Sequence, residues 1–152
     1  MSDIEIRPAR FESPEVQKVV AEALADLSQR YGGSGDDTPV TMSDFDPPDG
    51  AFFVAVRDGT LVGSGGWRRH GSDAELKRMF TTPAARGLGV ARRMLATIEE
   101  SARVAGCGRM ILETGYLQPE AIALYESAGY RRIADFGHYA GEDGVRSYAR
   151  DL

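Results

Sequence analysis

One stretch, from Glu75 to Glu99, limits the possible folds of this chain more than any other. Its first part, Glu75–Thr81, mixes apolar and long polar residues as a strand does, and Pro83 ends that strand. Apolar residues then recur at helical spacing, at Val90, Met94, Leu95 and Ile98. The sequence therefore predicts a strand, a turn and a helix in direct succession.

The segment Arg86–Gly89, which opens this helix, has the properties of an anion site. Glycine lets backbone N–H groups approach a ligand, and a helix N-terminus carries unpaired donors and the positive end of the helix dipole. The chain has a net charge of −5, yet the region from Leu76 to Ile98 contains no acid and five cations, Lys77, Arg78, Arg86, Arg92 and Arg93. We interpret this combination as a phosphate site.

Two alternatives remain open on these residues alone. A solvated basic helix face after an ordinary glycine turn has the same composition. The dinucleotide fingerprint requires a third glycine and a later acidic residue, for which Ala91 and Glu113 are the candidates by position.

A second set of motifs follows in the expected order. Glu75-Leu-Lys-Arg-Met79 precedes Arg86-x-x-Gly89-x-Ala91, and Leu112-Glu-Thr114 and Gln118-x-x-Ala-x-x-Leu-Tyr125-x-x-x-Gly-Tyr130 come after it. Together they resemble the GNAT superfamily of N-acetyltransferases, most densely between Phe52 and Tyr139. The resemblance implies acetyl-CoA as acetyl donor, with its pyrophosphate on the Arg86–Ala91 loop.

The resemblance also implies roles for individual residues. Backbone groups of Met79–Thr81 would pair with the pantetheine arm, and the N–H of Met79 or Phe80 would bind the thioester oxygen. The full implied donor-binding set is Met79, Phe80, Thr81, Arg86, Gly87, Leu88, Gly89, Val90, Ala91, Arg92, Gln118 and Tyr125.

Two residues are the implied catalysts. Tyr125 occupies the position of the tyrosine that protonates the leaving thiolate, and a phenol is protonated at neutral pH. Glu75 matches the spacing of the glutamate that serves some members as general base. The alternatives are that Tyr125 packs as a core aromatic and that Glu75 is a strand glutamate paired with Arg68 or Lys77.

Other chemistry-bearing residues fit the site less well. Cys107 follows the far end of the central helix, which argues against a cysteine intermediate, and His70 and His138 have no metal-ligand spacing, so no metal is expected. Candidates for the acceptor side are Tyr31, Asp36, Asp37, Trp67, Arg68 and Arg69.

Composition limits the class of protein. A chain of 152 residues with 42% apolar content is expected to form a single domain, 1–152, and one cysteine precludes an internal disulfide. The acidic balance argues against nucleic-acid binding. The N-terminus has no export signal and no apolar run spans a membrane, so we expect a cytoplasmic protein, monomeric or homodimeric.

Turn and cap signals divide the rest of the chain. They predict strands at Ile4–Arg7, Phe52–Arg57, Leu61–Trp67, Met110–Thr114, Tyr130–Phe136 and Val145–Arg150, helices after Ser13-Pro14 and over Ala121–Ala128, a mobile loop at Tyr31–Pro39 and a helical turn at Thr41–Phe45. The helix that begins near Val90 is expected to end near Ala105 with Gly106 as a left-handed cap, and the crossover between its flanking strands to be right-handed and parallel. The expected fold is α/β: a GNAT-like mixed, mostly antiparallel sheet of about six or seven strands with helices on both faces.

The function that follows is acetyl-CoA-dependent N-acetyl transfer to a primary amine, by direct attack in a ternary complex. The alternatives are a non-catalytic acyl-CoA-binding or regulatory module on the same fold, and an unrelated nucleotide-binding domain. The sequence does not identify the acceptor amine.

Overall fold

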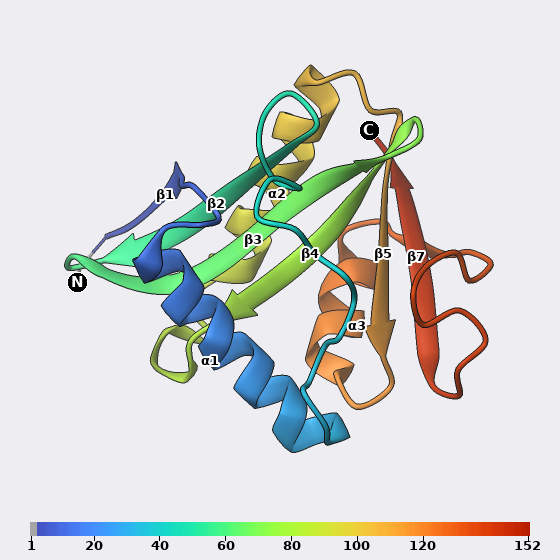
Figure 1. Ribbon diagram of the computed structural model, residues 1–152, viewed down its shortest axis with the longest axis horizontal. Coiled ribbons are helices and arrows are strands. Elements are labelled where there is room, and N and C mark those ends of the chain that lie inside the picture. The colour runs from blue at the N-terminus through green and yellow to red at the C-terminus, as the bar shows by residue number, and fades with distance from the viewer. Residues whose placement is uncertain (1–2) are drawn as a thin grey trace.

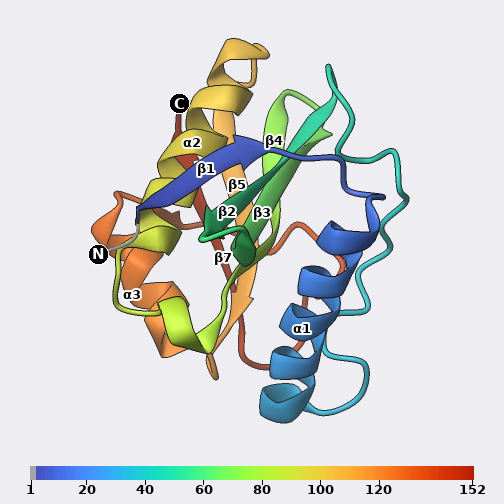
Figure 2. The ribbon, with the colours of Figure 1, turned by 90° about the vertical axis from the view of Figure 1, so that its left-hand side faces the viewer.

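The computed structural model describes residues 3–152, which form one seven-stranded sheet with helices on both faces (Figures 1 and 2). The elements are β1 (Ile4–Pro8), α1 (Pro14–Tyr31), β2 (Gly50–Arg57), β3 (Thr60–His70), β4 (Asp73–Thr81), the short 3₁₀ helix η1 (Pro83–Ala85), α2 (Val90–Val104), β5 (Arg109–Gly115), α3 (Pro119–Ser127), β6 (Arg131–Arg132) and β7 (Val145–Asp151). Within these residues, no helix combines the length and the apolar character needed to cross a membrane.

The strand order is β1-β2-β3-β4-β5-β7-β6. Among the strands of residues 3–152, the β4–β5 pair alone is parallel, and every other neighbouring pair is antiparallel. Helix α1 covers one face, and α2 and α3 cover the other (Figure 2). The predicted mixed, mostly antiparallel sheet with helices on both faces is confirmed.

Local signals account for several element boundaries. Asp58 and Gly59 take positive φ angles of 51° and 76° and join β2 to β3 as the predicted tight hairpin. Pro14 opens α1, and Gly106 has a φ of 90° just beyond the end of α2. Ser13 is the N-cap of α1, but its side chain makes no capping hydrogen bond.

Two predicted segments are wrong in extent. The strand predicted at Tyr130–Phe136 is reduced to Arg131–Arg132, because Asp135 instead accepts hydrogen bonds from the Gly141 N–H and the Ser147 hydroxyl and leads the chain into a loop. Thr41–Phe45 forms turns and no continuous helix: the Asp44 N–H donates to the Thr41 carbonyl at 3.2 Å and the Asp46 N–H to the Ser43 carbonyl at 3.1 Å, but these two turns do not join into a helical ladder.

Each face of the sheet has its own apolar core. On the α1 face, the rings of Phe11, Phe45 and Phe52 pack at centroid distances of 4.7–5.3 Å. The core on the α2 and α3 face is larger and includes Trp67, Met94, Ile98, Leu112 and Tyr125. These two cores hold the sheet rigidly between the helices.

Strands β4 and β5 pair only at their first residues. Their register contains Ala74 opposite Met110 and Glu75 opposite Ile111, and beyond these pairs the two strands diverge. The divergence coincides with an irregularity in the β3–β4 register between Ser64 and Gly66, where Arg78 adopts a positive φ of 60°. The Ser64 hydroxyl donates to the Arg78 carbonyl at 2.9 Å and holds this bulge in place. A gap therefore opens in the middle of the sheet.

We predict that Gly66→Ala destabilises the protein by about 1–3 kcal/mol. A Cβ at this position would lie 2.7 Å from the Ala51 carbonyl oxygen and 2.6 Å from the Phe52 ring, so the strands beside the bulge must move. Urea unfolding followed by circular dichroism measures the change. Gly108→Ala is the control, because its Cβ would meet nothing within 4 Å; equal stability losses in the two variants would contradict this packing.

Candidate functional site

A cavity of about 410 Å³ lies between the segment after β4 and the N-terminus of α2. From Gly87 through Arg92 no backbone N–H donates to a backbone carbonyl within residues 3–152. Gly87 and Gly89 have φ angles of 82° and 79°, which turn the chain so that this run leads into the first turn of α2. Successive free N–H groups at a helix N-terminus form a cradle suited to a phosphate.

The cations around this cradle are fixed by other contacts. The Arg86 Nε donates to the Thr81 carbonyl at 3.1 Å, and its guanidinium lies 5.8 Å from the centre of the Phe80 ring. Arg92 donates to the Ser127 hydroxyl at 2.8 Å. Both guanidinium groups retain further donors for an anion.

The structure brings together most of the predicted donor-binding residues. All of them line the 410 Å³ cavity except Leu88, which is 47% exposed and lies outside the lining. The five cations between Leu76 and Ile98 do not all surround this cavity, although the sequence had suggested that they would. Lys77 and Arg78 belong to a different cavity, so the predicted basic stretch serves two sites.

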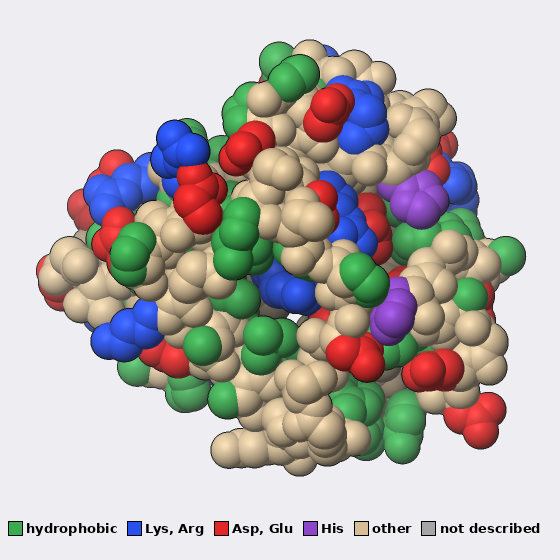
Figure 3. All heavy atoms as spheres, viewed as in Figure 1, with side chains coloured by type: hydrophobic (Ala, Val, Ile, Leu, Met, Phe, Trp, Pro, Cys, Tyr) green, Lys and Arg blue, Asp and Glu red, His purple; other side chains and the backbone are tan. Residues whose placement is uncertain are grey.

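That second cavity, of about 470 Å³, occupies the gap between β4 and β5. It is bounded by α1, by the strap Gly32–Asp37 and by the loop after Tyr139. Figure 3 shows a hollow near the middle of this face, with Lys or Arg side chains beside it. Asp26, Met79, Phe80, Gln118 and Tyr125 line both cavities, so the two spaces meet in the gap.

Tyr125 lies at this junction. It comes from α3, is 6% exposed, and its ring centroid is 5.6 Å from that of Tyr130. Burial raises the pKa of its phenol, so the hydroxyl is protonated at neutral pH. Within residues 3–152 this hydroxyl has no hydrogen-bond partner, which leaves its proton available to a group in the cavity.

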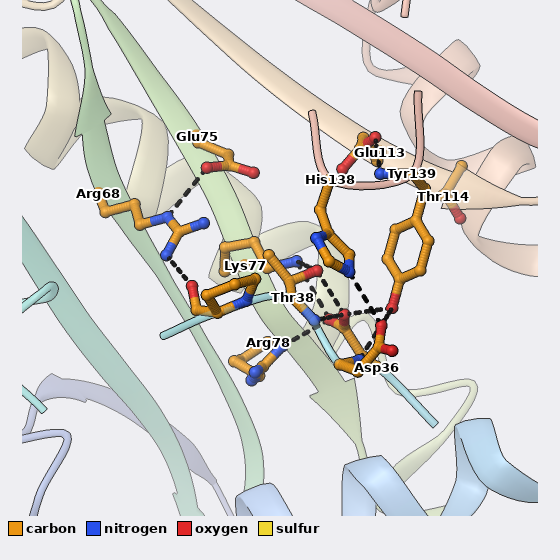
Figure 4. A network of polar contacts seen from close by, with 12 residues as sticks. Asp36, Thr38, Arg68, Glu75, Lys77, Arg78, Glu113, Thr114, His138 and Tyr139 are labelled. Atoms are coloured by element: carbon orange, nitrogen blue, oxygen red, sulfur yellow. Dashed lines mark hydrogen bonds and ion pairs between the residues drawn. The ribbon is translucent and has the colours of Figure 1, made fainter. Parts of the chain in front are cut away.

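Asp36 forms the centre of a polar cluster on the strap side (Figure 4). Its carboxylate accepts hydrogen bonds from Arg78, from Thr38 and from Lys77 at 3.1 Å, and the Tyr139 hydroxyl lies 2.9 Å away. Burial by itself would raise the pKa of Asp36, but the two cations and the Thr38 bonds outweigh burial and hold the pKa well below its usual range. Tyr31, the first residue of the predicted loop, belongs to α1, and residues 32–39 form no helix or strand. Hydrogen bonds from Lys77 and Arg78 to Asp36 attach this segment to β4.

The two glutamates of the central strands have different surroundings. Glu75 is 4% exposed, accepts a 2.9 Å hydrogen bond from Arg68, and lies outside both cavity linings. These contacts match the structural alternative for Glu75. Arg68 also bonds the Pro39 carbonyl and Asp44, so this ion pair fastens the segment between α1 and β2 to the sheet.

Glu113, on β5, faces the larger cavity. Its Oε2 accepts the Tyr139 N–H at 3.1 Å, whereas its buried Oε1 has no partner among the described residues. Burial is the main cause that raises the pKa of this carboxyl. In the sequence, Glu113 belongs to the Leu112-Glu-Thr114 motif and to the possible nucleotide fingerprint, and neither pattern predicted a role as base. The signal that could have found it is strand alternation, because Glu113 points to the opposite side of β5 from buried Leu112.

The acceptor-side candidates divide into two groups. Tyr31, Asp36 and Asp37 line the larger cavity, as expected. Trp67 does not: it is 1% exposed and donates to Ser101 of α2. Arg69 lies over the Trp67 ring and bonds the Ala105 carbonyl, so both residues face away from the acceptor side.

The remaining candidates lie outside the cavities. Cys107 is buried beside Arg69, beyond the C-terminal end of α2. His138 contacts Asp37 at 3.1 Å, and His70 packs edge-on against Phe136. Among the described residues, no group of His, Cys, Asp or Glu has the arrangement of a metal site.

Known proteins resemble this chain in sequence and in fold. The pattern of the Acetyltransferase (GNAT) family matches residues 20–130. An IAA acetyltransferase of Azospirillum brasilense is 38% identical over 133 residues, which cover 84% of this chain and 86% of that protein.

Solved structures share the fold. A crystal structure of a putative acyl-CoA N-acyltransferase from Klebsiella pneumoniae superposes with a TM-score of 0.81 and 25% identity over 98% of this chain and 97% of that one. The paia N-acetyltransferase of Thermoplasma acidophilum, solved in complex with coenzyme A, has a TM-score of 0.75 at 15% identity and covers 99% of both chains.

We predict that Asp36→Asn lowers the free energy of unfolding by about 2–4 kcal/mol at pH 7, because Lys77 and Arg78 lose their shared anion. The native pKa of Asp36 is depressed, so its contribution is complete above the unfolded pKa of about 3.9 and declines as the pH falls below that value. Urea unfolding at several pH values measures this. Asp58→Asn, at an exposed turn position, should change stability by less than about 0.5 kcal/mol. A pH-independent difference for Asp36→Asn would argue against the ionic explanation.

Proposed function

The chain belongs to the GNAT family of acetyltransferases, and we propose that it transfers an acetyl group from acetyl-CoA to a primary amine while both substrates are bound. The observation that carries this proposal is the junction of the two cavities at Met79, Phe80 and Tyr125. A thioester that entered from the phosphate side would meet an amine from the strap side within the gap. Direct attack then needs no covalent enzyme intermediate.

The chemical groups of acetyl-CoA match the lining of the smaller cavity. The N–H groups of Gly87–Arg92 would hold the pyrophosphate. The β5-facing edge of β4 beyond Glu75, which pairs with no strand among the described residues, would pair with the pantetheine amides. The N–H of Met79 or Phe80 would stabilise the negative charge that develops on the thioester oxygen. Gln118 occupies the N-cap position of α3, lines both cavities and completes the wall.

The proton transfers need one base and one acid. Acetyl-CoA supplies the acetyl group as a thioester; a C–N bond forms as the C–S bond breaks. The Tyr125 hydroxyl donates its proton to the departing sulfur. For the base we favour Glu113 over Glu75, because Glu113 faces the cavity and its raised pKa suits proton removal from an ammonium, directly or through water.

The competing proposal is a non-catalytic acyl-CoA-binding module. It requires the donor cavity alone and assigns no role to an unpaired Tyr125 hydroxyl at the junction. Thiol release from acetyl-CoA across a panel of amino acids, polyamines, aminoglycosides and peptide N-termini tests the proposed activity. Donor binding without acceptor-dependent thiol release would favour the binding module.

We expect Arg86→Ala to weaken acetyl-CoA binding about 10- to 150-fold, because the variant loses one charged hydrogen bond to the pyrophosphate. Calorimetry measures the dissociation constant. Arg103→Ala is the matched control, since Arg103 is exposed on α2 and pairs with Glu100. Gly89→Val should also weaken binding, although its φ of 79° adds backbone strain that Arg86→Ala avoids. An Arg86→Ala affinity equal to that of the Arg103→Ala control would remove the phosphate site from this loop.

The pH profiles of two variants separate the candidate bases. In the parent, kcat/KM should rise with pH through the raised pKa of Glu113, because only the deprotonated carboxylate accepts a proton. Glu113→Gln should remove this inflection and lower kcat/KM about 10²- to 10⁴-fold, while Glu75→Gln retains the inflection. Loss of the inflection in Glu75→Gln instead would assign the base to Glu75.

Tyr125→Phe keeps the ring but removes the proton donor. We predict that kcat falls about 10²- to 10⁴-fold, with acetyl-CoA affinity changed by no more than about 1 kcal/mol. Steady-state kinetics and calorimetry measure the two effects. A kcat within about threefold of the parent would leave Tyr125 a packing residue.

A further inference from the structure

We propose that the acceptor carries a carboxylate as well as its amine, and that Lys77 and Arg78 bind this carboxylate. The inference rests on the proposed acetyl transfer and specifies its acceptor as a small amino acid or a related zwitterion. The observation behind it is a pair of buried cations on the wall of the acceptor cavity.

Both cations lie on β4 at the bulge and line the 470 Å³ cavity. Each side chain is only 8% exposed. Burial of a charge is unfavourable unless an opposite charge compensates, and here two cations share the single carboxylate of Asp36. The pair therefore retains the capacity to bind a second anion.

The N–H groups of Lys77 and Arg78 that make no hydrogen bond to the described residues support a second anion at this site. Within residues 3–152, Arg78 uses only Nη1 in a hydrogen bond, and its buried Nε has no partner. Lys77 donates to Asp36 and to Thr38, which leaves one of its three N–H bonds unused. Asp36 thus positions both cations beside the cavity without saturating them (Figure 4).

The opposite wall supplies the complementary charge. Glu113 on β5 faces the same cavity, and Lys77 is near enough to favour its ionised form. A zwitterion can direct its carboxylate to β4 and its ammonium to Glu113. Asp26 pairs with Arg30 and Arg86, Asp37 contacts His138, and Glu142 and Asp143 are exposed at the outer loop, so these carboxylates do not occupy the cation pair.

Two segments that cross the cavity, the strap and the loop after β6, favour a small acceptor over a peptide chain. The Tyr139 hydroxyl lies 2.9 Å from Asp36 and 2.8 Å from Asp37, which links the strap to the loop that follows β6. In Figure 1 the segment after α1 passes in front of β4. An extended peptide would have to displace this link, whereas 470 Å³ accommodates a small molecule.

The first test uses the unmodified protein and acceptors matched in sets of three: an amino acid, its primary amide and the amine that lacks the carboxyl group. Thiol release should give a kcat/KM at least about tenfold higher for the amino acid than for either partner, as expected for a charged hydrogen bond. Equal values across the sets, or equal transfer to peptides with an amidated C-terminus, would overturn the carboxylate site and leave the acetyltransferase proposal standing.

The second test uses variants. Arg78→Gln should lower kcat/KM about 10- to 100-fold for the amino acid but less than about threefold for its amide. Arg78→Lys should recover part of the loss, and Arg103→Gln is the exposed control. An equal loss for amino acid and amide in Arg78→Gln would indicate a structural role only and contradict the proposal.

A binding measurement distinguishes failure of this site from failure of the proposed activity. Carboxylic acids that lack an amine should raise Tm in the presence of CoA in the parent but not in Arg78→Gln. This result without thiol release for any acceptor would support the carboxylate site and refute acetyl transfer. No Tm increase for any acid in the parent would count against the site.

Discussion

The bulge at Arg78 is the structural feature on which both cavities depend. A regular β4 would continue its parallel pairing with β5 and close the sheet. Instead the Ser64 hydroxyl holds the Arg78 carbonyl, the chain takes a positive φ, and pairing with β5 stops after Glu75. The β3 glycines opposite make this possible, since a Cβ at Gly65 would lie 2.5 Å from the Met79 sulfur. The unpaired β5-facing edge of β4 and the junction of the two cavities at Tyr125 both follow from this interruption.

The bulge also separates two electrostatic environments. On the α2 side, uncharged backbone N–H groups and partly exposed arginines surround the smaller cavity, which suits a strongly hydrated phosphate. On the α1 side, buried Lys77 and Arg78 face Glu113 across the gap. Fixed charges of both signs in a partly buried space favour a ligand that itself carries both charges, because each end of the ligand then meets the opposite charge. The strap therefore belongs to the acceptor site that we propose, and its Asp36 binds both cations.

Local signals in the sequence were sufficient for most elements and for the glycine turn with free N–H groups at the start of α2. The Asp58-Gly59 hairpin, Pro14 and Gly106 act through their own backbone preferences, so short segments reveal them. The acceptor side depends on contacts between distant segments: Asp36 meets Lys77 and Arg78 only after the sheet and the strap have formed. Strand alternation would have separated Trp67 from Arg68, since adjacent strand residues face opposite sides. Glycines inside a strand often mark a bulge, and Gly65 and Gly66 were the local signal for this one. Because that signal was not used, Lys77 and Arg78 were assigned to the phosphate site.

Hydrogen exchange with and without acetyl-CoA tests the central claim most directly and needs no acceptor. If the donor lies between the edge of β4 and the start of α2, peptides that cover Met79–Thr81 and Gly87–Arg92 should exchange more slowly in its presence, while peptides from β1 and β2 should not change. Saturating acetyl-CoA that leaves the exchange of both segments unaltered, or protects only segments remote from the gap, would contradict the account.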